Sequence, residues 1–196
     1  MSDFQKVKKD WMVYPGRGWR KRLVKAPVVY WRLGLGPILG RILLLLTTTG
    51  RKSGRPRRTM LDYTVMEGRK YIGSGWGETQ WYKNILADPR VTVQTKDGVE
   101  RAIARPVADD GELTRLYGLY RRRARRLPGE WAWKRWLESW GIQDNVEDFV
   151  AKKDRLYFLR LDPTDETTPA PRKADLVWVW PLLLLAALLV YFLTRR

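Results

Sequence analysis

Apolar and polar residues alternate through the middle of the chain, and this alternation is typical of strands that bury one face. Residues 42–49 are apolar and then β-branched, and the run stops at Gly50. A Lys-Asp-Gly sequence between two later runs is a hairpin signal. The pattern predicts about five or six antiparallel strands in a small barrel or a strongly curved sheet. The predicted strands cover residues 42–49, 59–66, 69–74, 91–95, 99–107 and 154–163.

Helical patterns interrupt these strands at two places. Thr79 is placed to cap a short helix that has apolar residues on one face and stops before Pro89. Asp109 and Glu112 form a capping-box pattern, which opens a helical insertion over residues 109–152. Arginines cover one side of the first helix of this insertion, and its second helix carries tryptophans at helical spacing.

The C-terminal part is predicted to be a polar linker, residues 164–175, followed by an apolar segment. Residues 176–193 contain no charge, and a helix of this length at about 1.5 Å per residue spans about 27 Å, enough for a bilayer core. Aromatic residues lie near both ends of the segment and basic residues flank it. A transmembrane helix is therefore predicted, and the alternative is a helix buried in the protein.

The N-terminal segment, residues 1–41, is basic and partly apolar, and it lacks the order of a signal peptide. Trp11, Trp19 and Trp31 lie beside cations, as in a helix at a membrane interface. The alternative is a helix that covers one end of the core. The main domain is predicted to comprise residues 42–163, with the helical insertion inside it.

Amino-acid composition limits the partners and the kinds of catalysis that the chain can have. The 196 residues include 38 Lys and Arg against 21 Asp and Glu, and the net charge of +17 favours an anionic partner such as nucleic acid, anionic lipid or a phosphorylated small molecule. The chain has no Cys and no His, which excludes disulfides, thiolate catalysis and Ser-His-Asp catalysis, and no metal site is expected. Any catalysis has to use the remaining side chains or a bound cofactor.

A basic segment, residues 47–58, joins the first two predicted strands. Gly50 and Gly54 allow backbone N–H groups to face an anion, and the donors beside them suit a phosphodiester or a carboxylate. The spacing of a Walker A loop is absent. A solvated basic turn or an RNA-contacting loop explains the same composition. The side-chain donors of the segment are Thr49, Arg51, Lys52, Ser53, Arg55 and Arg57.

Three motifs in one order, LLLTTTGRKSGRPRRTML, YIGSGWG and WYKNILADPRVTVQ, resemble the deazaflavin-dependent nitroreductase family. Proteins of this family are oxidoreductases that use the deazaflavin coenzyme F420. The resemblance covers residues 42–107 well and residues 156–163 loosely. It implies an α+β, mainly antiparallel fold, an FMN-binding-like split β-barrel with flanking helices, to which this chain adds the predicted transmembrane helix.

The resemblance also implies a site. In this family the basic hairpin holds the phosphate and the start of the oligoglutamate tail of the coenzyme, the next strand and loop run along the deazaflavin ring, and the following helix closes the pocket. The implied cofactor-binding residues are Thr49, Arg51, Lys52, Ser53, Gly54, Arg57, Arg58, Ile72, Gly73, Ser74, Gly75, Trp81 and Tyr82. The implied catalytic residues are Ser74, Tyr117 and Tyr120.

The expected activity is hydride transfer from reduced coenzyme F420 to a lipophilic acceptor such as a quinone, an enone or a nitro compound. Trp133, Trp136 and Trp140 are expected to offer an aromatic mouth for this acceptor, unless they only pack in the core. The protein is expected in a membrane, single-pass, with a cytoplasmic catalytic domain, as a monomer or a homodimer.

Two alternatives stay open at this point. One is a split barrel that uses FMN, or that binds a flavin or haem-type ligand. The other is a basic, membrane-associated module for nucleic acid or anionic lipid, although specific nucleic-acid binding is not expected.

Overall fold

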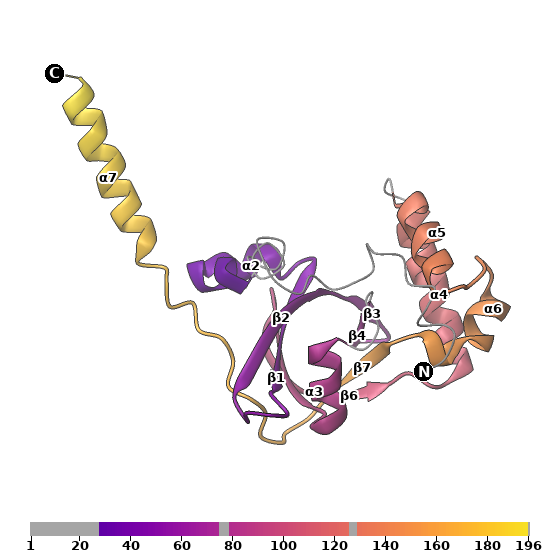
Figure 1. The fold of residues 1–196 in the computed structure, drawn as a ribbon. Coiled ribbons are helices and arrows are strands. Elements are labelled where there is room, and N and C mark those ends of the chain that lie inside the picture. Colours follow the sequence, from indigo (N-terminus) through magenta and orange to yellow (C-terminus); the bar gives the residue numbers. More distant parts are fainter. Residues whose placement is uncertain (1–27, 75–78, 126–128, 196) are drawn as a thin grey trace.

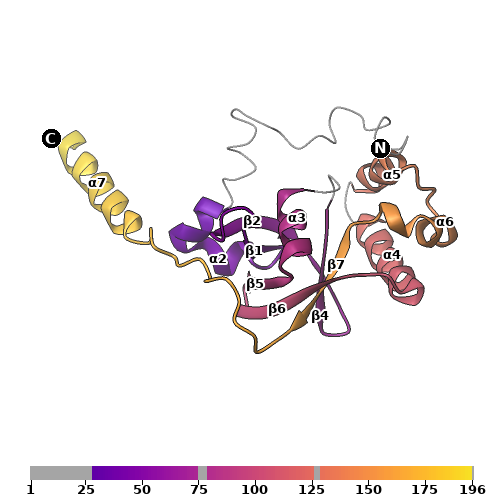
Figure 2. The same cartoon turned by 60° about the horizontal axis from the view of Figure 1, so that its bottom comes forward.

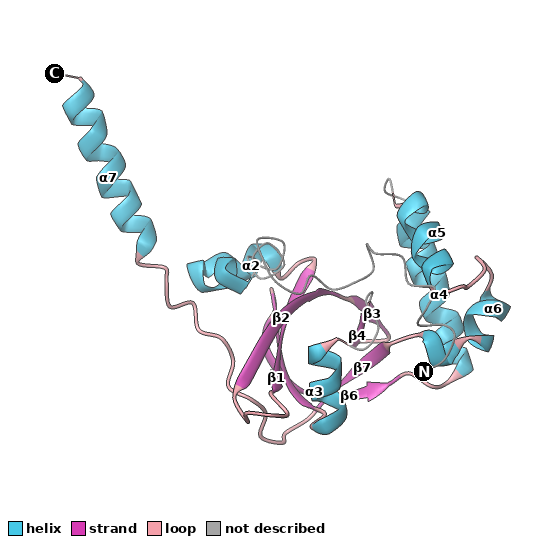
Figure 3. Ribbon diagram, viewed as in Figure 1, coloured by secondary structure: helices cyan, strands magenta, loops and turns pink. Residues whose placement is uncertain are grey.

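The structure, a computed structural model, describes residues 28–74, 79–125 and 129–195, which are organised around one curved antiparallel sheet (Figure 1). The order of its seven strands is β2-β1-β5-β6-β7-β4-β3. The sheet curls into a barrel-like ring with helices outside it (Figure 3), so the predicted α+β, split-barrel-like class is confirmed. The strands are β1 (Leu43–Thr49), β2 (Pro56–Asp62), β3 (Thr64–Met66), β4 (Arg69–Gly73), β5 (Arg90–Thr95), β6 (Gly98–Pro106) and β7 (Phe158–Pro163).

Two predicted strands differ most from the structure. The predicted strand 154–163 begins only at Phe158, because the helix η4 (Lys153–Arg155) precedes it, and the predicted strand 59–66 forms two strands. The chain begins pairing earlier, because Pro56 lies opposite Thr49 in the β1–β2 register. It then breaks between β2 and β3 at Tyr63, whose hydroxyl donates to the Gly40 carbonyl oxygen at 3.0 Å. This contact ties the corner of the sheet to the chain that follows α2 (Gly36–Leu39).

Alternate strand positions fill the barrel, as the period of a strand requires. Leu44 and Leu46 of β1 point inward with Val91 and Val93 of β5, and Trp81 joins them from α3 (Gln80–Ala87). Thr79 occupies the N-cap position of α3, as predicted, but its side chain forms no capping hydrogen bond. The helix lies against the barrel and joins its core (Figure 1).

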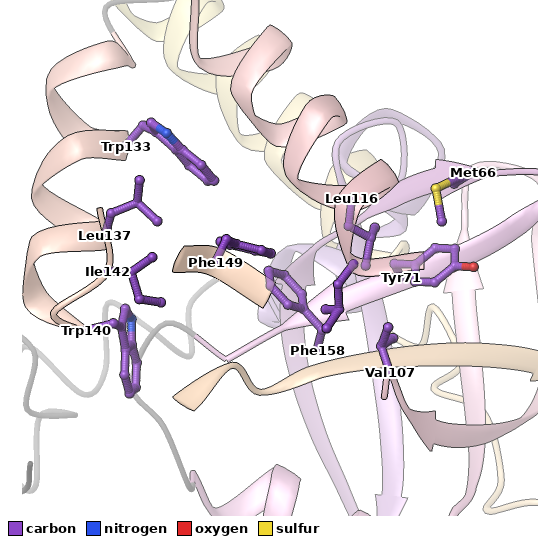
Figure 4. Packing of buried hydrophobic residues seen from close by; sticks show 11 residues of the cluster. Met66, Tyr71, Val107, Leu116, Trp133, Leu137, Trp140, Ile142, Phe149 and Phe158 are labelled. Carbon is purple, nitrogen blue, oxygen red and sulfur yellow. The ribbon is translucent and has the colours of Figure 1, made fainter. Parts of the chain in front are cut away.

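A second core lies between the sheet and the helical insertion (Figure 4). Phe149 and Phe158 are at its centre, with Leu116 and Leu137 packed from two helices. Asp109 accepts a hydrogen bond from the Glu112 backbone N–H at 2.7 Å, so the predicted cap is formed. The insertion contains α4 (Asp110–Arg125), α5 (Glu130–Ser139), α6 (Val146–Ala151) and the short helix η4 (Lys153–Arg155).

Residues 164–175, predicted as a linker, are bound along the outside of the barrel, and we call them the strap (Figure 2). The hydroxyls of Thr92 and Thr168 are 2.7 Å apart. The Gln94 amide donates to the Arg172 carbonyl oxygen at 3.0 Å and accepts from the Arg172 N–H at 2.6 Å. These bonds fix the strap to β5.

The C-terminal helix α7 (Val179–Thr194) projects away from the barrel (Figure 1). It has 16 residues and is shorter than the transmembrane helix predicted over 176–193. Within the described ranges of the chain, no helix combines the length and the apolar character that crossing a membrane requires. The prediction of a transmembrane helix is therefore not supported by the structure.

The N-terminal prediction is tested only in part. Trp11 and Trp19 lie outside the described residues. Trp31 begins the π-helix η3 (Trp31–Leu35) and is 6% exposed, with its ring packed against Gly36. An interfacial position for Trp31 is therefore wrong, because the side chain is buried within the protein.

Candidate active site

The basic hairpin has a defined turn between β1 and β2. The Gly50 N–H donates to the Arg55 carbonyl oxygen at 2.9 Å, and the N–H groups of Ser53 and Gly54 both donate to the Gly50 carbonyl oxygen. Gly54 has φ = +62°, a left-handed conformation that favours glycine. The second glycine of the motif is therefore required by the turn.

Arg51 connects this hairpin to α3. Its backbone N–H and its Nη1 donate to Asn84 Oδ1 at 3.3 and 3.1 Å, and its Nη2 donates to Gln80 Oε1 at 3.0 Å. Asn84 is buried, and its amide donates to Thr48 Oγ1 at 3.2 Å. All of these partners are neutral, so they orient the guanidinium and leave its charge uncompensated.

The hairpin as a whole carries positive charge that has no acidic partner. Arg57 donates to Ser53 Oγ at 3.3 Å, and Lys52 is exposed beside it. Thr49, half-buried, ends the strand at the base of the hairpin. In the described part of the chain, no carboxylate forms an ion pair with a cation of this hairpin. Such a cluster attracts an anion.

Arg58 does not belong to this cluster. Arg57 and Arg58 are adjacent in β2, so their side chains leave opposite faces of the sheet. The Arg57 guanidinium contacts Ser53 in the hairpin, whereas Arg58 Nη2 donates to the Ala170 carbonyl oxygen of the strap at 3.3 Å. The structure therefore separates Arg58 from the other predicted cofactor-binding cations.

A cavity of about 270 Å³ opens between the barrel and the helical insertion. It lies where β2 and β4 end and β7 begins, and α4 and α5 close its other side. Three of the predicted site residues, Gly73, Ser74 and Tyr120, line it. The described residues that line it are Asp62, Gly73, Ser74, Tyr120, Trp133, Trp136, Tyr157 and Phe158.

The helical wall of this cavity is a stack of aromatic rings. The rings of Tyr120 and Trp133 are 6.3 Å apart and 6° from parallel, and those of Trp133 and Trp136 are 5.4 Å apart at 27°. Flat apolar faces of this kind suit a flat apolar ligand. Trp140, predicted beside them, is only 1% exposed and packs in the core, so it does not line the cavity.

Gly73 and Ser74 form the barrel wall of the cavity. A Cβ atom on Gly73 would lie 2.8 Å from the Phe158 ring, so glycine is required by this close approach. Ser74 is 5% exposed, and its backbone N–H donates to the Tyr157 carbonyl oxygen at 3.1 Å. The two residues hold the start of β7 against the end of β4.

The two predicted tyrosines differ in position. Burial, with a smaller contribution from Asp62, raises the pKa of Tyr120 far above its ordinary value, so this hydroxyl stays protonated at the cavity wall. The Tyr117 hydroxyl instead donates to Asp144 Oδ1 at 2.9 Å, and its ring packs against Phe149 in the helical core. Tyr117 does not line the cavity.

The predicted site residues also include Ile72, Trp81, Tyr82 and Gly75, none of which is among the described residues that line the cavity. Ile72 and Trp81 are buried in the barrel core. Tyr82 meets Tyr157 edge to face at 5.1 Å, so α3 reaches the cavity through this pair. Gly75 lies outside the described residues.

Sequence reasoning missed three lining residues: Asp62, Tyr157 and Phe158. They come from the end of β2 and from the start of β7, which are far apart in the sequence. One signal was present for Phe158, because a glycine inside a strand marks close approach of a neighbour, and Gly73 is the register partner of Phe158.

The arrangement fits a flavin-like coenzyme with an anionic tail. The hairpin offers uncompensated cations, and α3 contacts both the hairpin and, through Tyr82, the cavity wall. Its donors are of the type that bind phosphate and carboxylate groups.

Comparison with known proteins agrees with this chemistry. Residues 32–127 match the model of the family described as F420H(2)-dependent quinone reductase. A structure of an F420-H2 dependent reductase, FDR-A, is 26% identical, covers 62% of this chain and 95% of its own, and has a TM-score of 0.38. The haem storage protein HutZ of Vibrio cholerae is 14% identical over 78% of this chain and 98% of its own, with a TM-score of 0.43.

A conserved hypothetical protein of Mycobacterium tuberculosis, Rv2991, is 17% identical over 66% of this chain and 78% of its own, with a TM-score of 0.39. Because these TM-scores are low, the assignment rests on the family match and on the motifs of the hairpin and of the strand that follows it. The chain is similar to the F420H(2)-dependent quinone reductase family over residues 32–127, and it is a reductase that uses the deazaflavin coenzyme F420.

Proposed function

We propose that the chain reduces a lipophilic acceptor, a quinone or a similar enone or nitro compound, inside the aromatic cavity. The observation that carries this proposal is that the stacked rings of Tyr120 and Trp133 line the same cavity as Ser74. When bound, the reduced deazaflavin supplies the hydride. The residues of the chain bind the coenzyme and orient the acceptor.

The hairpin is the part of the chain that would hold the coenzyme. Arg51, Lys52 and Arg57 present cations, and Ser53 presents a hydroxyl, to phosphate and carboxylate oxygens. Arg51 is held in place by Asn84, so its orientation does not have to be fixed on binding.

The walls of the cavity select the acceptor. Stacked indole and phenol faces favour a flat ring and exclude water from it. Among the described residues that line the cavity, Asp62 is the one carboxylate, and none is a lysine or an arginine. The cavity therefore favours neutral acceptors over anionic ones.

Reduction of a quinone to a hydroquinone needs a proton as well as a hydride. Burial raises the pKa of the Tyr120 hydroxyl, so this group stays protonated at the cavity wall but is a weaker acid than an ordinary tyrosine. Ser74 lines the same cavity. We assign Tyr120 as a hydrogen-bond donor to the acceptor oxygen and Ser74 as an orienting residue, and the proton comes from water.

Membrane association is part of the proposal. Residues 176–193 carry no charge, and Leu183, Leu185 and Phe192 of α7 are more than half exposed. An apolar surface of this extent favours contact with lipid. The single-pass arrangement with a cytoplasmic catalytic domain stays a prediction. Deleting residues 176–196 should abolish cosedimentation with vesicles while coenzyme binding persists, and equal cosedimentation would contradict it.

The acceptor site is tested with a matched pair of tryptophans. Trp136→Ala removes a ring that lines the cavity, whereas Trp131→Ala removes a ring of α5 that is 68% exposed and outside it. We expect the KM for a menaquinone analogue to rise about tenfold or more in Trp136→Ala, as for the loss of one stacked ring in a binding pocket, and to stay unchanged in Trp131→Ala. Equal effects in both variants would show that the acceptor does not use this cavity.

A further inference from the structure

Arg58 of β2 and Arg172 of the strap lie together on the outer face of the barrel. The Arg58 side chain lies on the face of β2 opposite to that of Arg57. It donates to the carbonyl oxygen of Ala170, which precedes Arg172 by two residues. Arg172 is held by its own backbone, which forms two hydrogen bonds with the Gln94 side chain. The proximity of the two guanidinium groups is repulsive, and burial together with Arg172 lowers the pKa of Arg58.

Both arginines keep a buried donor without a partner. Among the described residues, no acceptor meets Arg58 Nε or Arg172 Nε, although both atoms are shielded from solvent. The buried Thr47 hydroxyl is also unpartnered there, and Thr47 lies opposite Arg58 in the β1–β2 register, on the same face. Unmet buried donors cost free energy, so three of them on one face indicate a missing acceptor.

The charges of this region do not balance. Asp175 is the carboxylate at the end of the strap, and it is shared by Arg32, at 2.8 and 3.1 Å, and by Arg172, at 3.3 Å. Arg58 therefore has the Ala170 carbonyl oxygen as its side-chain acceptor and no carboxylate of its own in the described chain. One acid among three arginines leaves a net positive site.

We propose that Arg58 and Arg172 form a second anion site, which binds a phosphate group and is separate from the coenzyme hairpin. Two guanidinium forks and a threonine hydroxyl supply more donors than a planar carboxylate accepts, and they suit the oxygens of a phosphate. The site is at the base of α7, where the Trp178 indole N–H donates to the Asp175 carbonyl oxygen at 3.1 Å. The phosphate of an anionic phospholipid and a free phosphate share this chemistry.

The test follows the strap itself, because a ligand between Arg58 and Arg172 joins it to β2. Amide hydrogen exchange of residues 164–175 is measured in the full-length protein with inorganic phosphate and with chloride at equal ionic strength. Phosphate at about ten times its dissociation constant should slow exchange of the strap about tenfold, by linkage. Coenzyme is absent from this measurement, so its outcome is independent of the proposed reductase function.

The matched variants separate this site from general charge effects. Arg58→Gln with Arg172→Gln removes the site, and Arg122→Gln with Arg125→Gln removes the same charge from exposed positions of α4. The α4 double variant should keep the full phosphate effect and the strap double variant should lose it. If the strap double variant unfolds, Arg58→Lys with Arg172→Lys keeps the charge without the Nε donors, and about tenfold weaker phosphate affinity is expected.

A second arm identifies the source of the phosphate. Vesicles of phosphatidylcholine alone are compared with vesicles that contain phosphatidylglycerol. Protection of the strap by phosphatidylglycerol vesicles but not by inorganic phosphate assigns the site to a lipid headgroup, and protection by inorganic phosphate assigns it to a soluble phosphate. Protection in neither arm, or equal protection in the strap double variant and the wild type, overturns the proposal.

Discussion

The indole N–H of Trp133 donates to Asp144 Oδ1 at 2.9 Å, and this bond fixes the ring on which the aromatic cavity is built. The same oxygen accepts the Tyr117 hydroxyl at 2.9 Å, and Arg121 pairs with the other oxygen at 3.1 Å. Asp144 therefore joins α4 to α5 behind the acceptor site and acts on the acceptor only through Trp133.

Removing Asp144 should affect stability and acceptor binding together. Asp144→Ala leaves the Tyr117 hydroxyl and the Trp133 N–H without their acceptor and removes the nearer of the two carboxylates that pair with Arg121, so we expect a loss of about 2–4 kcal/mol of unfolding free energy. Urea denaturation measures this, and the KM for the acceptor should rise as Trp133 loses its anchor. Asp97→Ala, at an exposed hairpin, is the control. Similar unfolding midpoints for the two variants would contradict this role.

The cationic hairpin should carry coenzyme affinity. Arg51→Ala with Lys52→Ala should weaken binding of the coenzyme by about 2–4 kcal/mol in total, because charge-assisted hydrogen bonds are strong but not additive. Titration followed by tryptophan fluorescence measures the dissociation constant. Lys96→Ala with Arg101→Ala, on the β5–β6 hairpin, should bind like the wild type. Unchanged affinity in the Arg51 and Lys52 double variant would rule out this hairpin as the phosphate site.

Gly73→Ala tests the contact that shapes the barrel wall. The new methyl group would meet the Phe158 ring at 2.8 Å, so Phe158 has to move, and overpacking of this kind costs about 1–3 kcal/mol. We expect a lower thermal midpoint and weaker acceptor binding. Gly68→Ala is an informative comparison, since nothing lies within 4 Å of its Cβ position but its φ is +75°. If Gly73→Ala is as stable and as active as the wild type, the close approach of Phe158 has no functional consequence.

Alkaline stability should depend on Tyr71. Its hydroxyl donates to Glu112 Oε1 at 2.6 Å, and burial followed by this hydrogen bond raises the pKa of Tyr71 to about 12. The unfolded chain loses this proton near the ordinary value of 10.0, so the contribution is complete below that pH and is lost as the pH rises toward 12. The fall is at most about 1.4 kcal/mol per pH unit.

Tyr71→Phe isolates this group from the other titrating residues. The variant should be less stable near neutral pH, yet its unfolding free energy should fall less steeply than that of the wild type above about pH 10. Urea denaturation over this range gives both slopes. Parallel slopes would mean that Tyr71 titrates alike in the folded and unfolded chains.

Local patterns were enough to predict most of the strands. The apolar and then β-branched run of residues 42–49 predicted β1, and the turn at Lys96-Asp97-Gly98 predicted the β5–β6 hairpin, since composition and turn chemistry are local properties. The break at Tyr63 was not predictable in this way, because it accompanies a hydrogen bond to Gly40, far away in the sequence. The bonded strap was missed for the same reason: its polar composition is typical of a linker, but its partners are side chains of β5.

The sequence predicted the hairpin cations better than it predicted the residues around the cavity. The hairpin cations are local to one turn, so the sequence placed them. Strand alternation also implies that the side chains of Arg57 and Arg58 point apart, as their separate partners show. Tyr120 was placed at the acceptor side, whereas Tyr117, three residues earlier on the same helix, binds Asp144 instead. The contact of Asp144 with Trp133 comes from tertiary packing, and no spacing in the sequence indicates it.

Single-turnover oxidation of the reduced coenzyme tests the central claim most directly. The full-length protein is loaded with reduced coenzyme F420 in liposomes, and the return of the oxidised coenzyme is followed by stopped flow with and without menaquinone. The account predicts rapid, quinone-dependent oxidation that slows in Trp136→Ala and not in Trp131→Ala. Oxidation at the same rate with and without the quinone, in protein that binds the coenzyme, would contradict it.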